Sequence, residues 1–184
     1  MPTVLGHTFA AVALGSTVNR SVINWKLWTL GIIAAIIPDA DVIAFRIGIP
    51  YESIWGHRGF SHSFLFALIV GLFFAYIFYN KSLSIKSRLW LITYFFLCTA
   101  SHTILDAMTS GGLGVAFFFP FDNTRHFLPW RPVKVSPLAL DSFMTDRGLK
   151  VIMSELIWIG IPSLFLIIVS TVYRKIYSTR KSII

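Results

Sequence analysis

Charged residues are scarce in this 184-residue chain. They make up 13% of it, about half of the quarter that a soluble domain usually carries. Hydrophobic residues make up 55%, and the aromatic ones include 17 Phe and 6 Trp. This composition excludes a disordered chain and argues against a soluble globular protein. The length allows a single domain, residues 1–184.

Cysteine and the common nucleotide-binding motifs are also missing or nearly so. The one cysteine, Cys98, lies inside an apolar run, which excludes a disulfide framework and a cysteine-based zinc finger. Neither GxxxxGKS/T nor GxGxxG occurs, so nothing indicates a nucleotide-binding fold. The formal net charge is +8. In so apolar a chain this excess is more typical of membrane flanks than of nucleic-acid binding.

Five apolar stretches come close to the length of about 20 residues that a helix needs to cross a bilayer. They lie at about 3–18, 27–45, 62–79, 89–107 and 151–173. The predicted fold is therefore an all-α integral membrane protein, a bundle of about five transmembrane helices. The longest segment between spans, 108–150, is rich in glycine and proline. It is predicted to form an irregular extracytoplasmic flap with little regular structure.

Lysine and arginine predict how the bundle is oriented. With five spans, the segments 19–26, 80–88 and the tail from residue 174 lie on one side. They hold nine of the sixteen basic residues and none of the eight acidic ones. Basic residues favour cytoplasmic flanks. We therefore predict a multi-pass protein of the inner or plasma membrane, with the N-terminus outside and the C-terminus in the cytoplasm.

Histidines and aspartates in or next to the spans gather at one membrane level. The orientation, which comes from lysine and arginine alone, places all of them near the outer ends of the spans. The spacing of four between His102 and Asp106 puts both on one helix face. His57 and His62 suit a turn into the third span, with Ser61 or Ser63 as the helix cap. The full set is His7, Asp39, Asp41, His57, His62, His102 and Asp106.

These side chains predict a metal site. An aspartate at the centre of a bilayer costs about 2.5–3.5 kcal/mol on insertion scales, and clustered aspartates also repel one another. Carboxylates and neutral imidazoles are ligands for Zn²⁺ or Mn²⁺. We expect all seven residues to be candidate ligands for a divalent metal, Zn²⁺ before Mn²⁺, with one to three ions and two favoured. The lack of a cysteine ligand favours a catalytic over a structural site.

Three basic residues are candidates for substrate binding, because a guanidinium pairs well with a phosphate. They are Arg58, Arg125 and His126. Asp39, Asp41 and Arg58 are the candidate catalytic residues: the aspartates would bridge, orient or act as base, and Arg58 would stabilise developing charge. Plainer explanations stay open. Helix-end aspartates can pair with arginine, loop histidines can be solvated, and interfacial arginines can contact lipid phosphate.

The motifs resemble those of the LexA-regulated, membrane-bound metal-dependent hydrolase family, the YdjM-like proteins. The resemblance covers about residues 1–140 and implies a metal-dependent hydrolase without naming its substrate. The His-x-x-x-Asp pair is also distantly similar to the zinc-dependent phospholipase C and S1/P1 nuclease motif, which implies phosphoester hydrolysis. The resemblance is carried by Gly6-His7, Pro38-Asp39-Ala40-Asp41, His57-Arg58-Gly59-Phe60-Ser61-His62-Ser63, and Ser101 to Asp106 with Thr109 to Gly112.

The predicted function is a membrane-embedded hydrolase that acts on a phospholipid or lipid-linked phosphate at the extracytoplasmic face. The alternative is a cation or proton transporter or channel that uses the same cluster. It predicts polar residues through the whole membrane depth, whereas here they stay on one side. A structural subunit of a larger envelope complex is a third possibility. Nucleic-acid binding is not favoured, and the oligomeric state is not predicted.

Overall fold

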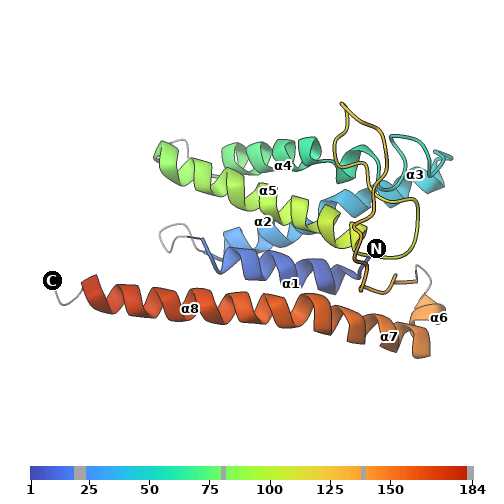
Figure 1. The fold of residues 1–184 in the computed structure, drawn as a ribbon. Helices are drawn as coiled ribbons and strands as arrows, with labels where there is room; N and C mark the ends of the chain where they lie inside the picture. The colour runs from blue at the N-terminus through green and yellow to red at the C-terminus, as the bar shows by residue number, and fades with distance from the viewer. Residues whose placement is uncertain (19–23, 80–81, 138–139, 182–184) are drawn as a thin grey trace.

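The fold was analysed in a computed structural model that describes residues 1–18, 24–79, 82–137 and 140–181. The described residues form helices and no strands (Figure 1). The elements are α1 (Val4–Gly15), α2 (Trp25–Ile36), η2 (Ile37–Val42), α3 (Ile43–Arg46), η3 (Phe60–His62), α4 (Phe64–Ile77), α5 (Ile85–Ala107), α6 (Leu140–Phe143), α7 (Asp146–Glu155), η4 (Leu156–Gly160) and α8 (Ile161–Lys181).

The predicted all-α membrane fold is confirmed. Three continuous helical stretches have the length and apolar composition needed to cross a membrane: Trp25–Arg46, Ile85–Ala107 and Asp146–Ile176. The other two predicted spans are the shorter apolar helices α1 and α4. Each of the five predicted stretches is therefore mostly helical, although the ends differ by several residues.

Capping side chains explain where the helices begin. The Ser63 side chain accepts a hydrogen bond from the backbone N–H of Phe66, so α4 starts at Phe64 and not at residue 62. Ser84 caps α5 in the same way, so that α5 begins at Ile85, four residues before the predicted start of that span. Thr145 caps α7, which continues through η4 into α8, so this last helix starts at residue 146 and not at 151.

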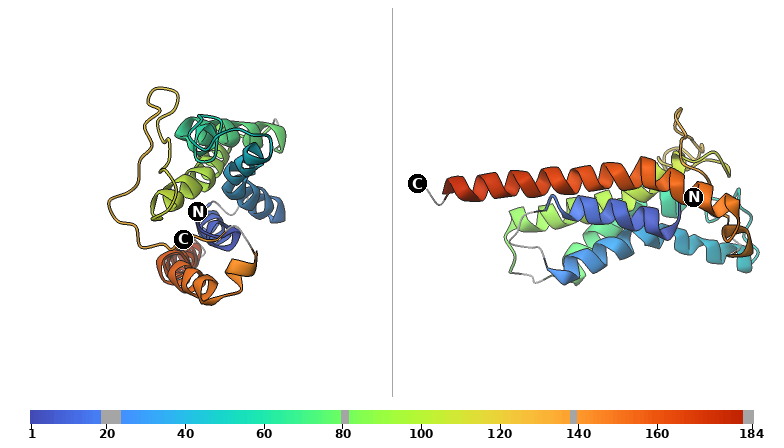
Figure 2. Two further views of the ribbon diagram at one scale, coloured as in Figure 1. Left: turned by 90° about the vertical axis from the view of Figure 1, so that its right-hand side faces the viewer. Right: turned by 90° about the horizontal axis from the view of Figure 1, so that it is seen from below.

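Helix α5 is central to the bundle and packs against α1, α2 and α4, while α8 lies along α1 (Figures 1 and 2). The core between α2, α4 and α5 is apolar, with Leu27, Phe74 and Phe95 buried. At the other side of α1, the backbone N–H and the hydroxyl of Thr3 donate to the two carboxylate oxygens of Glu155, at 2.6 and 2.5 Å. This contact fastens the start of α1 to the long helix α7–α8.

The predicted irregular flap, 108–150, is wrong in its last part, where α6 and the start of α7 are helical. Residues 108–137 form the flap in the structure, and they cross one end of the bundle (Figure 2). Its only ladder contacts among the described residues are two isolated bridges, Thr109 with Val133 and Val115 with His126. Val115 and Val133 are fully buried, so the flap is packed onto the bundle although it lacks regular structure. We call this end of the bundle the flap end.

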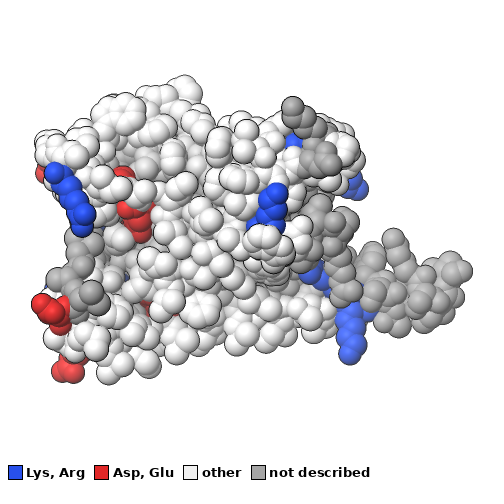
Figure 3. Space-filling view, turned by 180° about the vertical axis from the view of Figure 1, so that it is seen from behind, with Lys and Arg blue, Asp and Glu red and all other residues white. Residues whose placement is uncertain are grey.

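Charge is unevenly distributed along the bundle axis. In Figure 3 the acidic groups lie near the flap end, with some Lys or Arg beside them, whereas the charged groups towards the opposite end are basic, and largely uncharged surface lies between. Lys26 and Lys86 lie in the first turns of α2 and α5, at that opposite end. Arg20 and Lys81, which belong to the predicted basic flanks, lie outside the described residues. A membrane-embedded bundle requires such a band of uncharged surface, because the band faces the hydrocarbon core of the bilayer.

Glycine permits the close approach of α4 and α5. A Cβ atom added to Gly71 would lie 2.8 Å from the carbonyl oxygen of Ile92 and 3.1 Å from the backbone nitrogen of Phe96. Both are backbone atoms of α5, so the helices would have to separate. Small residues commonly allow such contacts between membrane helices.

We therefore expect Gly71→Ala to destabilise the protein by about 1–3 kcal/mol, the usual cost of overpacking. Thermal unfolding in detergent measures this. Gly160→Ala is the matched control, because its added Cβ would meet the flexible side chain of Leu156 at 3.2 Å and a backbone atom, the carbonyl oxygen of Glu155, only at 3.8 Å. Equal melting temperatures for the two variants would contradict the tight α4–α5 contact.

Candidate metal centre

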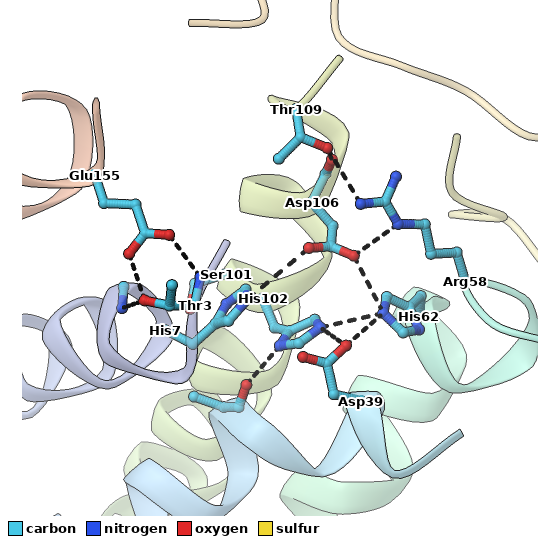
Figure 4. A network of polar contacts seen from close by, with 12 residues as sticks. Thr3, His7, Asp39, Arg58, His62, Ser101, His102, Asp106, Thr109 and Glu155 are labelled. Atoms are coloured by element: carbon cyan, nitrogen blue, oxygen red, sulfur yellow. Dashed lines mark hydrogen bonds and ion pairs between the residues drawn. The ribbon is translucent and has the colours of Figure 1, made fainter. Parts of the chain in front are cut away.

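The seven predicted ligand residues converge at the flap end, as Figure 4 shows for most of them. They come from five parts of the chain. Helix α1 carries His7, η2 carries Asp39 and Asp41, the loop before η3 carries His57, η3 carries His62, and α5 carries His102 and Asp106. The convergence depends on η2, because this 3-10 helix, which has Pro38 in its first turn, directs the chain towards α5 and η3.

Four of these residues form a buried quartet: Asp39, His62, His102 and Asp106. One potential ligand atom from each lies within 4.8 Å of all the others. The Nε2 atoms of His62 and His102 are 3.4 Å from Asp106 Oδ2 and 3.3 Å from Asp39 Oδ1, respectively. The two histidines and Asp106 are fully buried.

The hydrogen bonds of both histidines leave their Nε2 atoms free to bind a cation. His102 Nδ1 lies 2.7 Å from the carbonyl oxygen of Ala35, which only accepts, so the proton is on Nδ1. His62 Nδ1 lies 3.1 Å from Asp41 Oδ2, which assigns its proton in the same way. When both rings are neutral, as metal binding requires, the two Nε2 atoms face each other at 3.1 Å with their lone pairs. A cation between them removes this repulsion, and such partners on the other ring nitrogen are typical of metal-binding histidines.

The charges of the cluster also suit a divalent cation. Three carboxylates (Asp39, Asp41 and Asp106) face one buried guanidinium, that of Arg58. With neutral histidines this leaves two negative charges. His62 precedes α4 and lies outside the spanning helices. Burial opposes its protonation, but the hydrogen bonds with Asp106, Asp39 and Asp41 outweigh this and raise the pKa of His62 to about 10. Without a metal ion, a proton on His62 supplies positive charge to the site, and a divalent cation would replace that proton.

Asp39 and His7 have buried polar atoms that need a partner. Neither carboxylate oxygen of Asp39, and neither ring nitrogen of His7, makes a hydrogen bond within the described part of the chain. His7 stacks on His102 with ring centroids 3.8 Å apart, and its Nε2 is 3.8 Å from Asp106 Oδ1. Because unpartnered buried polar atoms are rare, both side chains suit ligation. His7 lies beside the quartet, on the opposite carboxylate oxygen of Asp106 from His62.

Asp41 is bonded differently from Asp39. Its Oδ1 is 2.7 Å from His57 Nδ1, and its Oδ2 accepts from the Ser61 hydroxyl and the Arg58 backbone N–H. Together with the contact to His62, these bonds occupy both oxygens. Asp41, His57 and His62 also form a second group with ligand atoms within 4.8 Å of one another. The bonding favours Asp41 as the residue that orients both histidines.

Arg58 is a buried cation with a specific set of partners. Its Nε pairs with Asp106 at 2.9 Å, Nη1 donates to the Gly111 carbonyl oxygen, and Nη2 donates to the Thr109 hydroxyl. Its φ is 65°, which is uncommon for a residue other than glycine. Nothing in the sequence shows that Thr109 and Gly111 hold an arginine.

Arg125 and His126 lie outside the quartet. The Arg125 guanidinium donates to the carbonyl oxygens of Tyr51, Ser53 and His57, so it fastens the flap to the loop before η3. Partial burial lowers the pKa of this guanidinium. His126 is partly exposed, and its Nε2 lies 3.6 Å from Asp122. The predicted roles of Arg125 and His126 in substrate binding stay predictions.

A cavity of about 170 Å³ reaches the cluster from the flap side. It is lined by Met1, Tyr51, His57, Arg58, Gly111, Gly112, Val135 and Ser136. A Cβ atom on Gly112 would lie 2.4 Å from the Tyr51 hydroxyl and 3.1 Å from Arg58 Nη1. Glycine at this position, with φ of +80°, therefore keeps the space beside Arg58 open.

The comparisons with known proteins agree with a membrane protein of this type. The family described as YdjM inner membrane protein matches residues 1–177. Inner membrane protein YbcI of Escherichia coli (strain K12) is 39% identical over 166 residues, which cover 90% of this chain and 95% of the relative. The uncharacterized protein YvsG of Bacillus subtilis (strain 168) is 35% identical over 94 residues, 47% of this chain and 54% of the relative. No solved structure is significantly similar. The chain thus belongs to the YdjM family of inner membrane proteins.

Proposed function

We propose that this protein is a metal-dependent phosphoester hydrolase that acts on a lipid. The observation that carries the proposal is the pair of buried imidazoles whose Nε2 atoms face each other, 3.1 Å apart, between two carboxylates. Asp39, His62, His102 and Asp106 would hold the first ion. A second would use His7 and the remaining oxygen of Asp106. When bound, a divalent ion supplies Lewis acidity and a nucleophile at neutral pH.

Arg58 is suited to bind the phosphoryl group. A guanidinium has five N–H donors, and three bonds to protein atoms leave two of them. The side chain lines the cavity, so these N–H groups can donate hydrogen bonds to a phosphate oxygen and stabilise the charge that develops on it. Its pairing with Asp106 fixes the guanidinium beside the quartet before substrate arrives.

His57 is suited to transfer a proton. Its Nδ1 is bonded to Asp41, and its Nε2 has no partner among the described residues while the ring lines the same cavity. An imidazole held by a carboxylate in this way has a fixed tautomer and orientation. In this proposal His57 acts on the leaving group, Asp41 positions it, and Asp39 is a metal ligand.

The proposed substrate is a phospholipid or a lipid-linked phosphate, because the cluster lies at one end of a membrane-embedded bundle. Basic flanks at the opposite end favour the cytoplasm, and this supports an extracytoplasmic position for the flap end and the site. A lipid headgroup at that level would meet the cavity without leaving the membrane.

A metal-dependence assay with purified full-length protein tests the proposal. We expect turnover of phosphatidic acid or bis(p-nitrophenyl) phosphate that is lost on chelation and restored by Zn²⁺ or Mn²⁺. Asp39→Asn should abolish it, whereas Asp122→Asn, which changes an exposed flap carboxylate, should not. Metal-loaded protein that hydrolyses no phosphoester, but conducts cations or protons in vesicles, would overturn the proposal in favour of a transport function.

A further inference from the structure

A second, larger cavity adjoins the one beside Arg58. It measures about 390 Å³ and is lined mainly by apolar residues: Pro2, Val4, Leu5, Pro137 and Phe143. Met1 and Ser136 line both cavities. The backbone N–H of Ser136 donates to the Met1 carbonyl oxygen at 3.0 Å, so these two residues mark the boundary between them.

The two cavities differ in chemistry. The smaller one presents the spare donors of Arg58, the free Nε2 of His57 and the hydroxyl of Tyr51, for which no hydrogen-bond partner is found among the described residues. In the larger one, the polar groups of Thr3 are already used, because its N–H and hydroxyl bond to Glu155. One end of the combined space therefore suits an anion and the other suits hydrocarbon.

The larger cavity has the size and location for a lipid chain. An apolar cavity of about 150 Å³ accepts benzene, so 390 Å³ accommodates a longer stretch of hydrocarbon. Val4 and Leu5 are 51% and 62% exposed at the start of the apolar helix α1. A chain can thus enter from the surrounding bilayer without crossing water.

We propose that this larger cavity binds the hydrocarbon chain of the substrate lipid, with the phosphate group in the smaller cavity beside Arg58 and His57. The inference rests on the proposed function for the phosphate end. It defines the substrate class as amphiphiles whose chain lies against the first turn of α1, Pro137 and Phe143. Binding of the hydrocarbon chain in the larger cavity can be tested without measuring turnover.

Photo-crosslinking tests the hydrocarbon end directly. The probe is phosphatidic acid with a diazirine near the end of one acyl chain, in phosphatidylcholine vesicles that contain the full-length protein. We expect labelling at residues 1–5 and at Ser136, Pro137 and Phe143, which line the cavity. Leu5→Trp, which fills the cavity, should be labelled about tenfold less. Leu164→Trp is the matched control, because Leu164 is similarly exposed, at 57%, on α8. It should label like the wild type.

Hydrolysis by the same variants separates this inference from the proposed function. Leu5→Trp should raise KM for phosphatidic acid about tenfold and leave the turnover of bis(p-nitrophenyl) phosphate unchanged. Phe143→Ala, which removes a wall of the cavity, should also raise KM for the lipid. Labelling spread evenly over the apolar surface, or equal in the two tryptophan variants, would overturn the chain site. Localised labelling without any hydrolysis would overturn the proposed function and support the chain site.

Discussion

His102→Ala is expected to abolish hydrolysis and to weaken Zn²⁺ binding by more than 100-fold. His102 supplies an Nε2 directed at Asp39 and is fixed by the Ala35 carbonyl oxygen. Removal of a residue that hydrogen-bonds to a metal ligand typically weakens metal binding about 10–100-fold, so removal of a ligand itself should weaken it more. Competition with a chromophoric chelator measures the affinity, and phosphoester turnover measures the activity.

Two further variants make this result specific. Cys98→Ala changes a fully buried residue one turn earlier on α5, and it should bind metal like the wild type. Asp41→Asn should weaken binding by only about 10–100-fold, because Asp41 orients His62 through Nδ1 in this account. If Asp41→Asn lost as much affinity as His102→Ala, Asp41 would be a ligand and the division between the two aspartates would be wrong.

Arg58→Met is expected to destabilise the metal-free protein by about 3–5 kcal/mol, the usual cost of removing one partner of a buried ion pair. The change leaves Asp106 buried without its guanidinium. A divalent ion on the quartet would neutralise the same carboxylate. The destabilisation should therefore be smaller with Zn²⁺ than with chelator. Thermal unfolding in detergent under both conditions measures the difference.

The same variant should lose at least about 100-fold in turnover, as for removal of one donor to a developing oxyanion. Arg88→Met is a useful comparison, because Arg88 is a buried arginine at the opposite end of α5, where it donates to the Ala75 carbonyl oxygen. It should destabilise the protein equally with and without Zn²⁺. An Arg58→Met penalty that does not change with metal would show that Asp106 does not bind the ion.

The helical fold could be predicted from hydropathy because each apolar stretch is long enough to stand out. The helix ends could not, since they depend on caps. Thr145 begins the last helix before its apolar part, and Asp146 and Arg147 in its first turn lower the local hydropathy. The break of the second span into α2, η2 and α3 reflects Pro38, which the sequence shows, but the resulting direction of Asp39 depends on packing.

The convergence of histidine and aspartate could be predicted, because the helices alternate in direction and the polar residues always fall at the same end. The roles within the cluster could not be predicted. Whether a histidine offers Nδ1 or Nε2 depends on neighbours such as the Ala35 carbonyl oxygen, which only the packing of α2 against α5 positions. The bonding of Arg58 to Thr109 and Gly111 depends likewise on how the flap leaves α5.

Metal content is the most direct test of the central claim that the quartet is a metal site. Wild-type protein purified in detergent from metal-replete cells would be analysed for Zn and Mn, beside Asp106→Asn and the exposed control Asp122→Asn. We predict one to two equivalents of a divalent metal in the wild type and in Asp122→Asn, and a clear loss in Asp106→Asn. A wild type without bound metal, which also takes up none on addition of Zn²⁺ or Mn²⁺, would contradict the account.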